Sequence, residues 1–383
     1  MSSLSHPDEH RPISFAGLAE QQARLGPAVS AAVERVWAHG QYIMGPEVGL
    51  LEDRLAALAG TRHAVACSNG TDALILALLA NGVGRGDAVI VPTFTFAATA
   101  EAVARVGATP VFADVAESTY NIDPASAKDC LSVAYANDLR PRALVAVDLF
   151  GQPAEYSALR ALCDERELLL VSDAAQSFGA KWEDRPAASI SDVTTTSFFP
   201  SKPLGCHGDG GAVFTSDDSM AKVMRSLRTH GQGSHKYENV HIGLNARLDT
   251  IQAAILLVKL DAFPEELEAR DAVARRYDQG LPGGVVGPVV DPRAVSTWAQ
   301  YTVRITDRDR TARTLKSAGI PTAIYYPTPL HEQPAYRDLP RAPAGLAVAE
   351  ALSRDVLSLP IHAYLGPSDQ DHVLSTLAQA HAG

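Results

Sequence analysis

Two patterns of apolar residues alternate between residue 47 and about residue 230. In the first, apolar residues recur at helical spacing. Residues 46–60 are an example, because Val48, Leu51, Leu55 and Leu58 share one face and Gly60 is a natural helix stop. Similar helices are expected at 70–82, 97–107 and 153–167. In the second, short apolar runs predict strands at 64–68, 87–92, 109–114, 143–150, 168–173, 193–199 and 210–216.

Short strands separated by helices are typical of βαβ units. The chain is therefore predicted to be an α/β protein with a mostly parallel sheet that is buried on both faces. In such sheets, ligands bind beyond the carboxyl ends of the strands. The residues that follow each strand are accordingly the first candidates for chemistry.

The pattern changes after about residue 250. Residues 250–281 predict a long helix that is interrupted near Pro264. A Pro/Gly-rich passage at 281–292 leads into a smaller mixed α/β region. We expect an N-terminal arm (1–25), a large domain (26–255) and a small C-terminal domain (256–383).

Composition narrows the class of protein. The chain has 383 residues, 46% of them hydrophobic, and a formal net charge of -11, which argues against a nucleic-acid partner. The four cysteines are scattered without CxxC spacing, and no apolar run is long enough to span a bilayer or to act as a signal peptide. We therefore expect a cytoplasmic protein with no membrane partner and no metal site.

Three strand ends carry residues with possible chemistry. Gly70 and Thr71 open a helix after the run at 64–68, which suits a phosphate or carboxylate, although an ordinary helix cap has the same pattern. Phe96 can stack on a flat ring or simply pack in the core. Asp173 ends a buried run, where it either caps a turn or holds a proton on a pyridine nitrogen.

Lys202 stands in the segment SFFPSKPLGCHGDGG at 197–211. Most lone lysines are solvated, but here prolines fix the backbone and glycines allow a ligand to approach closely. A partly desolvated lysine has a lowered pKa and can form a Schiff base. Together, Lys202, Asp173, Phe96 and the Gly70/Thr71 turn match the aldehyde, ring nitrogen, ring face and phosphate of pyridoxal 5′-phosphate (PLP).

Segments over nearly the whole chain match one known pattern: GQYIMGPEVGLLED at 40–53, CSNGTDAL at 67–74, PTFTFAAT at 92–99, DLFGQPA at 148–154, SDAAQSFGA at 172–180, SFFPSKPLGCHGDGGA at 197–212, NARLDTIQAAIL at 245–256 and YYPTPLHEQPAY at 325–336. They resemble the DegT/DnrJ/StrS family of PLP-dependent sugar aminotransferases. That resemblance implies fold type I, with a seven-stranded, mostly parallel sheet flanked by helices and a smaller C-terminal α/β domain.

The resemblance also implies roles for individual residues. Lys202 would form the Schiff base and move protons, and Asp173 would pair with the ring nitrogen. Gln176 would contact the ring hydroxyl, Phe96 would stack on the ring, and the phosphate would be held by Gly70, Thr71 and Ser197. A homodimer with shared active sites is implied, in which Asn245 reaches the neighbour's phosphate and Arg247 the neighbour's substrate.

The implied reaction moves an amino group from L-glutamate to a nucleotide-linked keto-sugar, with pyridoxamine 5′-phosphate as the other cofactor form. The chain is most similar to the branch that aminates UDP-2-acetamido-2-deoxy-3-oxo-glucuronate, but that branch tends to have His at Tyr325 and Arg at His241. These two residues, with Tyr326 and Arg247, are the expected substrate contacts. A 4-keto sugar or a keto-sugar nucleoside of an antibiotic pathway stays open, as does a non-catalytic PLP-binding regulator.

Overall fold

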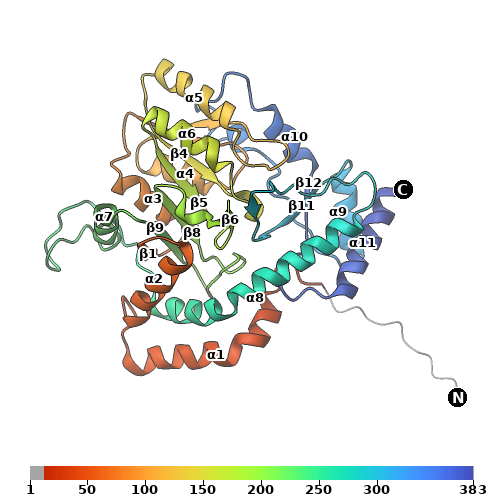
Figure 1. Cartoon of the computed structure of the whole chain (residues 1–383), viewed down its shortest axis with the longest axis horizontal. Helices are drawn as coiled ribbons and strands as arrows, with labels where there is room; N and C mark the ends of the chain where they lie inside the picture. Colours follow the sequence, from red (N-terminus) through yellow and green to blue (C-terminus); the bar gives the residue numbers. More distant parts are fainter. Residues whose placement is uncertain (1–12, 383) are drawn as a thin grey trace.

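The computed structural model of the chain describes residues 13–382. Its central strands are β1 (His63–Cys67), β2 (Asp87–Pro92), β3 (Thr109–Ala113), β4 (Arg140–Val147), β5 (Leu169–Asp173), β8 (Val193–Ser197) and β9 (Gly211–Thr215). They form a seven-stranded sheet in the order β1-β9-β8-β5-β4-β2-β3, in which only β9 runs against its neighbours (Figure 1). Every run predicted as a strand is found, and the predicted α/β class is confirmed.

Helices cover both faces of this sheet (Figure 1). They are α2 (Pro46–Ala59), α3 (Gly70–Ala80), α4 (Ala98–Arg105), α5 (Pro124–Ala136), α6 (Tyr156–Arg166), α7 (Asp218–Arg228) and α8 (Thr250–Gly280), whereas α1 (Leu18–His39) packs against α8. Successive residues of a strand point to opposite faces. In β1, Val65 therefore packs in the core shared with α3 to α6, whereas Ala66 packs in the core shared with α2 and α8.

The predicted interruption of the long helix at Pro264 is wrong. α8 is one helix of 31 residues with Pro264 inside it. A proline inside a helix removes one backbone hydrogen bond, but packing on both sides can hold the helix together. Phe263 is buried in the core beneath the sheet, and Val273 is buried in a separate C-terminal core.

The C-terminal core is built around α8 and a small sheet of β11 (Tyr301–Arg304) and β12 (Val356–Leu359). Helices α9 (Arg308–Ser317) and α11 (Pro367–Ala382) complete this part, whereas α10 (Ala347–Asp355) buries Ala349 and Leu352 in the core shared with α3 to α6. A third sheet joins β10 (Ala294–Val295), β6 (Lys181–Trp182) and β7 (Arg185–Pro186). Short 3₁₀ turns lie at Leu149–Gly151, Ala187–Ser189 and Leu330–Glu332.

The predicted domain boundary between residues 255 and 256 falls inside α8. The division into 26–255 and 256–383 therefore stays a prediction. The predicted arm, 1–25, includes residues 1–12, which lie outside the described residues, and the first turns of α1.

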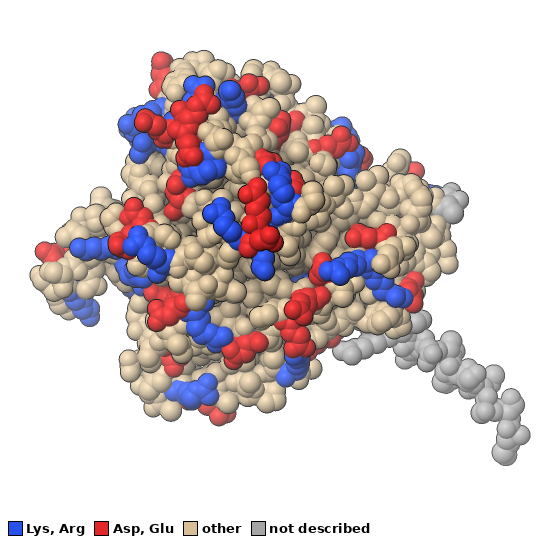
Figure 2. Space-filling model, in the orientation of Figure 1, with Lys and Arg blue, Asp and Glu red and all other residues tan. Residues whose placement is uncertain are grey.

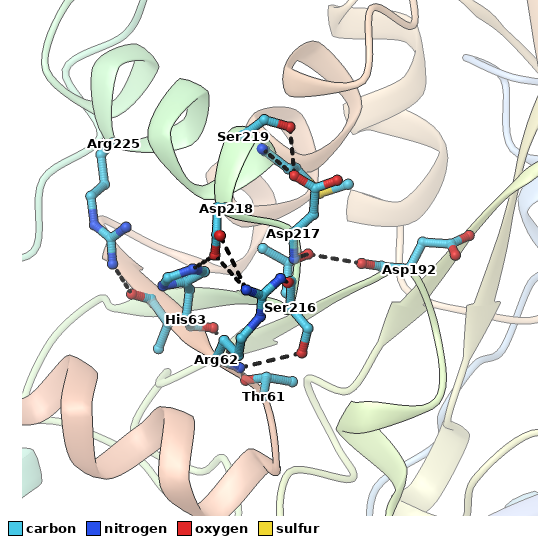
Figure 3. A network of polar contacts seen from close by, with 12 residues as sticks. Thr61, Arg62, His63, Asp192, Ser216, Asp217, Asp218, Ser219 and Arg225 are labelled. Atoms are coloured by element: carbon cyan, nitrogen blue, oxygen red, sulfur yellow. Dashed lines mark hydrogen bonds and ion pairs between the residues drawn. The ribbon is translucent and has the colours of Figure 1, made fainter.

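An exposed polar network joins the amino end of β1 to α7 (Figure 3). His63 Nε2 lies 2.7 Å from Asp218 Oδ1, Arg62 pairs with the same carboxylate, and Asp217 caps α7 by accepting a hydrogen bond from Met220 N. The strands' carboxyl ends lie at the opposite edge of the sheet.

Figure 2 shows Lys and Arg interspersed with Asp and Glu over one face of the molecule. Within residues 13–382, no helix is both long and apolar enough to cross a membrane.

Side chains satisfy the free edge of β1. Ala66 N donates to Glu52 Oε1 (2.9 Å), and Ala66 O accepts from Arg228 Nη1 (2.6 Å). Arg228 also pairs with Glu52 and is only 3% exposed. A sheet edge is thereby closed by a buried ion pair, whose two charges depend on one another.

Replacing Arg228 with Ala should lower the free energy of unfolding by about 3–5 kcal/mol, because Glu52 would lose its partner while staying mostly buried. Urea denaturation followed by circular dichroism measures this. Arg225 is the matched control, since its side chain is 40% exposed and lies 3.9 Å from Glu52. Arg225→Ala should cost less than about 1 kcal/mol. Equal losses in the two variants would contradict the assignment.

Candidate active site

The predicted cofactor residues gather at the carboxyl edge of the sheet. Gly70 follows β1, Phe96 follows β2, Asp173 ends β5, Ser197 ends β8 and Lys202 follows it. Because all of these strands run parallel, their carboxyl ends meet at one edge. The topology thus brings together residues that are far apart in the sequence.

Gly70 and Ser197 lie in close contact at the start of α3. A Cβ atom at Gly70 would stand 2.7 Å from Ser197 Cβ, so only glycine fits there. Asn69 caps the helix by accepting a hydrogen bond from Asp72 N (2.8 Å). The N–H groups of a first helical turn have no intrahelical acceptor. The start of α3, with the Ser197 side chain packed against Gly70, is therefore suited to binding an anion.

Asp173 is buried at the end of β5, with 7% of its surface exposed. Oδ1 accepts a hydrogen bond from Ala175 N (3.1 Å), and Oδ2 accepts one from Thr99 Oγ1 (3.4 Å). Burial raises the pKa of this carboxyl, while the Ala175 N–H, the Lys202 charge and the Thr99 hydroxyl lower it. The carboxylate is thus held in a fixed position, where a nearby cation stabilises it.

Lys202 lies in the loop between β8 and β9 and is partly buried. The loop is compact: Lys202 N donates to Phe199 O (2.6 Å), and a Cβ at Gly205 would lie 2.5 Å from Pro200 O. Burial lowers the pKa of the Lys202 ammonium, and the negative charge of Asp173 opposes that shift. The result is an amine that loses its proton more easily than a surface lysine does.

Gln176 is held by contacts from three directions. Its side-chain Oε1 accepts from Phe150 N (2.6 Å), and its Nε2 donates to Tyr326 Oη (3.4 Å). Its main-chain carbonyl oxygen accepts from Thr297 Oγ1 (2.7 Å). Because Oε1 is used by the Phe150 N–H, the amide orientation is fixed. The Nε2 group therefore points toward Tyr326.

Aromatic rings line the same edge. Phe96 is 61% exposed, and its ring centroid lies 6.4 Å from that of Tyr326. Tyr326 also contacts Tyr325, whose ring lies 6.5 Å from that of Phe15. Burial raises the pKa of the Tyr326 phenol, so it is neutral and can donate a hydrogen bond. An exposed Phe96 is not core packing, which leaves its face available for stacking.

The remaining predicted substrate residues lie on a separate segment. Asn245 and Arg247 flank Ala246, whose carbonyl accepts a hydrogen bond from Ser68 N (3.1 Å), so this segment runs beside the start of α3. Asn245 and His241 are exposed, and Arg247 is partly buried. Arg247 Nε is buried without a hydrogen-bond acceptor among the described residues.

This set of residues fits PLP. Lys202, whose pKa is lowered, suits the aldehyde, and the buried carboxylate of Asp173 suits the ring nitrogen. The exposed ring of Phe96 suits the cofactor ring, and the start of α3 at Gly70, where no Cβ fits, suits the phosphate. The roles of the individual residues stay predictions. Sequence reasoning missed Thr99 and Thr297; the only signal for Thr99 was its place in PTFTFAAT, just beyond a strand end.

A histidine–carboxylate group lies close to the Phe96 loop. The possible ligand atoms of His331, Glu332 and Glu350 lie within 4.8 Å of one another. His331 Nδ1 lies 2.7 Å from Thr93 Oγ1, and its Nε2 lies 3.3 Å from Glu350 Oε1. Both ring nitrogens thus have protein partners, and the expectation of no metal stays a prediction.

Comparison with known proteins agrees with this geometry. A 45% identical structure, a DegT DnrJ EryC1 StrS aminotransferase from Brucella abortus, superposes with a TM-score of 0.95 over 97% of this chain and 100% of its own. The protein Spr1654 from Streptococcus pneumoniae, solved in PLP and PMP forms, is 26% identical, with a TM-score of 0.86 over 93% of this chain and 95–96% of its own.

A UDP-2-acetamido-2-deoxy-3-oxo-D-glucuronate aminotransferase from Pseudomonas aeruginosa is 46% identical over 354 residues, which are 92% of this chain and 96% of the relative. A family model matches residues 24–378. The predicted resemblance is thereby confirmed, and the chain belongs to the DegT/DnrJ/EryC1/StrS aminotransferase family.

Proposed function

We propose that the protein is a PLP-dependent aminotransferase that moves the amino group of L-glutamate to a nucleotide-linked keto-sugar of the 3-keto-hexuronate class, giving an aminosugar. The observation that carries this proposal is the gathering of Lys202, the buried Asp173 and the Gly70–Ser197 contact at the carboxyl edge of the sheet, where the charges of Lys202 and Asp173 act on one another. The 46% identity to the Pseudomonas aeruginosa enzyme supports the choice of sugar.

The residues divide the work between binding and proton transfer. Bound PLP would supply an aldehyde that accepts amino groups and a ring that withdraws electrons. Lys202, with its lowered pKa, accepts a proton from the Cα atom of the donor and later returns one. Asp173 would hold a proton at the ring nitrogen, and Gly70, Thr71 and Ser197 would bind the phosphate.

Donor recognition in this proposal uses Arg247. A guanidinium binds a carboxylate through two parallel hydrogen bonds, which suits L-glutamate and a hexuronate alike. Arg247 is partly buried on the segment that Ala246 O joins to Ser68 N, beside the start of α3 where the phosphate is proposed to bind.

The proposal includes a homodimer with shared sites. Ile43 pairs with Asp249, so the exposed 42–44 loop lies beside the segment that carries Asn245 and Arg247. Large apolar side chains are unusually exposed in these regions, Ile242 to 96%. They are Tyr42, Ile43, Met44, Phe96, Phe199, Tyr237, Val240 and Ile242. Exposed apolar groups of this kind mark interaction surfaces. All four cysteines are unpaired, which suits the cytoplasmic location included in the proposal.

A second substrate class is favoured by two residues. Tyr325 and His241 replace the His and Arg expected of uronate enzymes, and the loss of a guanidinium weakens carboxylate recognition. A 4-keto sugar or a keto-sugar nucleoside therefore remains the alternative. A regulator without turnover would have no use for an amine of lowered pKa facing a buried carboxylate.

Lys202→Ala should abolish turnover, with a loss of at least about 10⁴-fold, because the variant lacks both the nucleophile and the proton carrier. Purified wild-type protein should be yellow with PLP, and its visible absorbance should fall on addition of L-glutamate. Lys259→Met is the matched control, since Lys259 is a buried lysine, at 4% exposed, that lies inside α8 with Cys206 and Glu266 as its titratable neighbours. A wild-type protein that stays colourless with added PLP would contradict the proposal. A yellow protein whose absorbance does not change with L-glutamate would indicate another amino donor.

Mixing Lys202→Ala chains with Arg247→Ala chains should restore activity. In a mixed dimer, one site combines Lys202 from one chain with Arg247 from the other, so random pairing should recover about a quarter of wild-type activity. Denaturation and joint refolding, followed by an assay of amino transfer, measures this. Each variant refolded alone is the control. No recovery in a sample shown by light scattering to contain dimers would place both residues in the same subunit's site.

His241→Arg tests the choice of sugar. If the natural substrate is a hexuronate, the added guanidinium should raise kcat/KM for the keto-uronate about tenfold or more relative to its non-acidic analogue. His241→Gln is the control for loss of the imidazole. An unchanged ratio would exclude contact between position 241 and the sugar carboxylate.

A further inference from the structure

A buried carboxylate that the proposed mechanism does not use lies directly after β4. Asp148 is 0% exposed. Its Oδ1 accepts hydrogen bonds from Ala154 N and Tyr156 Oη, both 2.8 Å, and its Oδ2 accepts one from Ser177 Oγ (2.7 Å). Ala154 N can only donate, and both hydroxyls donate in this arrangement, so these contacts favour the charged form of the carboxyl group.

These bonds connect Asp148 to both ends of the segment that carries the site. Ser177 directly follows Gln176. Tyr156 Oη also lies 2.5 Å from Ser172 Oγ, and Ser172 directly precedes Asp173. In addition, Asp148 N donates to Asp173 O (3.1 Å). One side chain and its backbone thus hold the segment 172–177 at its start and its end.

Asp148 also places a second carboxyl group beside Asp173, which adds a negative charge once it is ionised. Burial raises the pKa of Asp148 to about 7, the bonds from Ser177, Ala154 and Tyr156 lower it, and the charge of Asp173 raises it further. The titratable groups that act on it are Tyr156 from α6 and Asp173 from β5. The pKa of the Tyr156 phenol is raised well above its ordinary value by burial, so it stays neutral.

Two neighbouring buried carboxylates are unfavourable unless a positive charge lies close to them. Lys202 supplies one such charge only while its amine is protonated. A protonated ring nitrogen facing Asp173 supplies another, and each buried anion nearby makes that proton harder to lose.

We propose that Asp148 is a positioning residue of the cofactor site, which fixes Asp173 and Gln176 and whose negative charge favours the protonated form of the ring nitrogen that Asp173 faces. This inference rests on the proposed PLP site. In this proposal the Asp148 carboxylate acts in two ways: it accepts hydrogen bonds that position its neighbours, and it contributes a negative charge.

Asp148→Asn keeps the size of the side chain and one accepting oxygen and removes the charge, and the Ser177 hydroxyl can accept from the new amide nitrogen. The matched control is Asp87→Asn, because Asp87 is also buried, at 2% exposed, accepts a hydrogen bond from Gly84 N and lies at the amino end of β2. Both variants are prepared as the full chain without cofactor. PLP labelled with ¹⁵N at its ring is then added, and its dissociation constant and the pH midpoint of the ring ¹⁵N signal are measured.

Asp148→Asn should lower the midpoint of the ring nitrogen by about one pH unit and weaken PLP binding about tenfold. Asp87→Asn should leave both values at those of the wild type. Identical midpoints in the two variants would overturn the inference while leaving the proposed function standing. A wild type that binds no PLP would overturn both.

Ser177→Ala is the second variant, in case Asp148→Asn does not fold. It removes one donor from the carboxylate, so Asp148 holds its proton more tightly and carries less charge at neutral pH. The ring nitrogen midpoint should shift in the same direction as in Asp148→Asn, but by less. A folded Ser177→Ala protein with a wild-type midpoint would contradict the role of the charge.

Discussion

The site depends on a carboxylate that is buried at the end of a parallel strand. Removing the charge of Asp173 from water is costly unless a cation lies close to it. Lys202 provides that cation from another loop, although burial disfavours its own charge. Each charge therefore favours the other, while burial makes the lysine give up its proton more easily than a surface lysine does. That easier loss of the proton is what proton transfer and nucleophilic attack require.

Close backbone packing makes this pairing possible. Gly205 allows the Lys202 loop to fold back on Pro200, and Gly70 allows α3 to begin against Ser197. Gly211 in β9 serves the same end, because a Cβ there would lie 2.5 Å from Asn69 O. The glycines that made the sequence around Lys202 conspicuous are thus needed for steric reasons, independent of any ligand.

Local pattern was enough to predict the strands, since each is a short apolar run between helices. It was also enough to suggest Asp173 and Lys202, because a charged residue after a buried strand is unusual. The assignments of Gln176 and Ser197 came from resemblance alone. Pairings were out of reach: nothing in DLFGQPA indicates that Asp148 meets Tyr156 and Ser177, because those contacts arise only when β4 and β5 lie side by side. At Pro264 local propensity misled, since packing at both ends of α8 outweighs one lost hydrogen bond.

The continuity of α8 has a consequence for how the molecule comes apart. This single helix places Phe263 in the core beneath the sheet and Val273 and Tyr277 in the C-terminal core. Melting either core would fray a helix that the other core needs. The two are therefore expected to be lost in one cooperative transition. A protease acting on the native protein would find few places to separate them, and a fragment that ended within α8 would expose apolar surface from both cores at once.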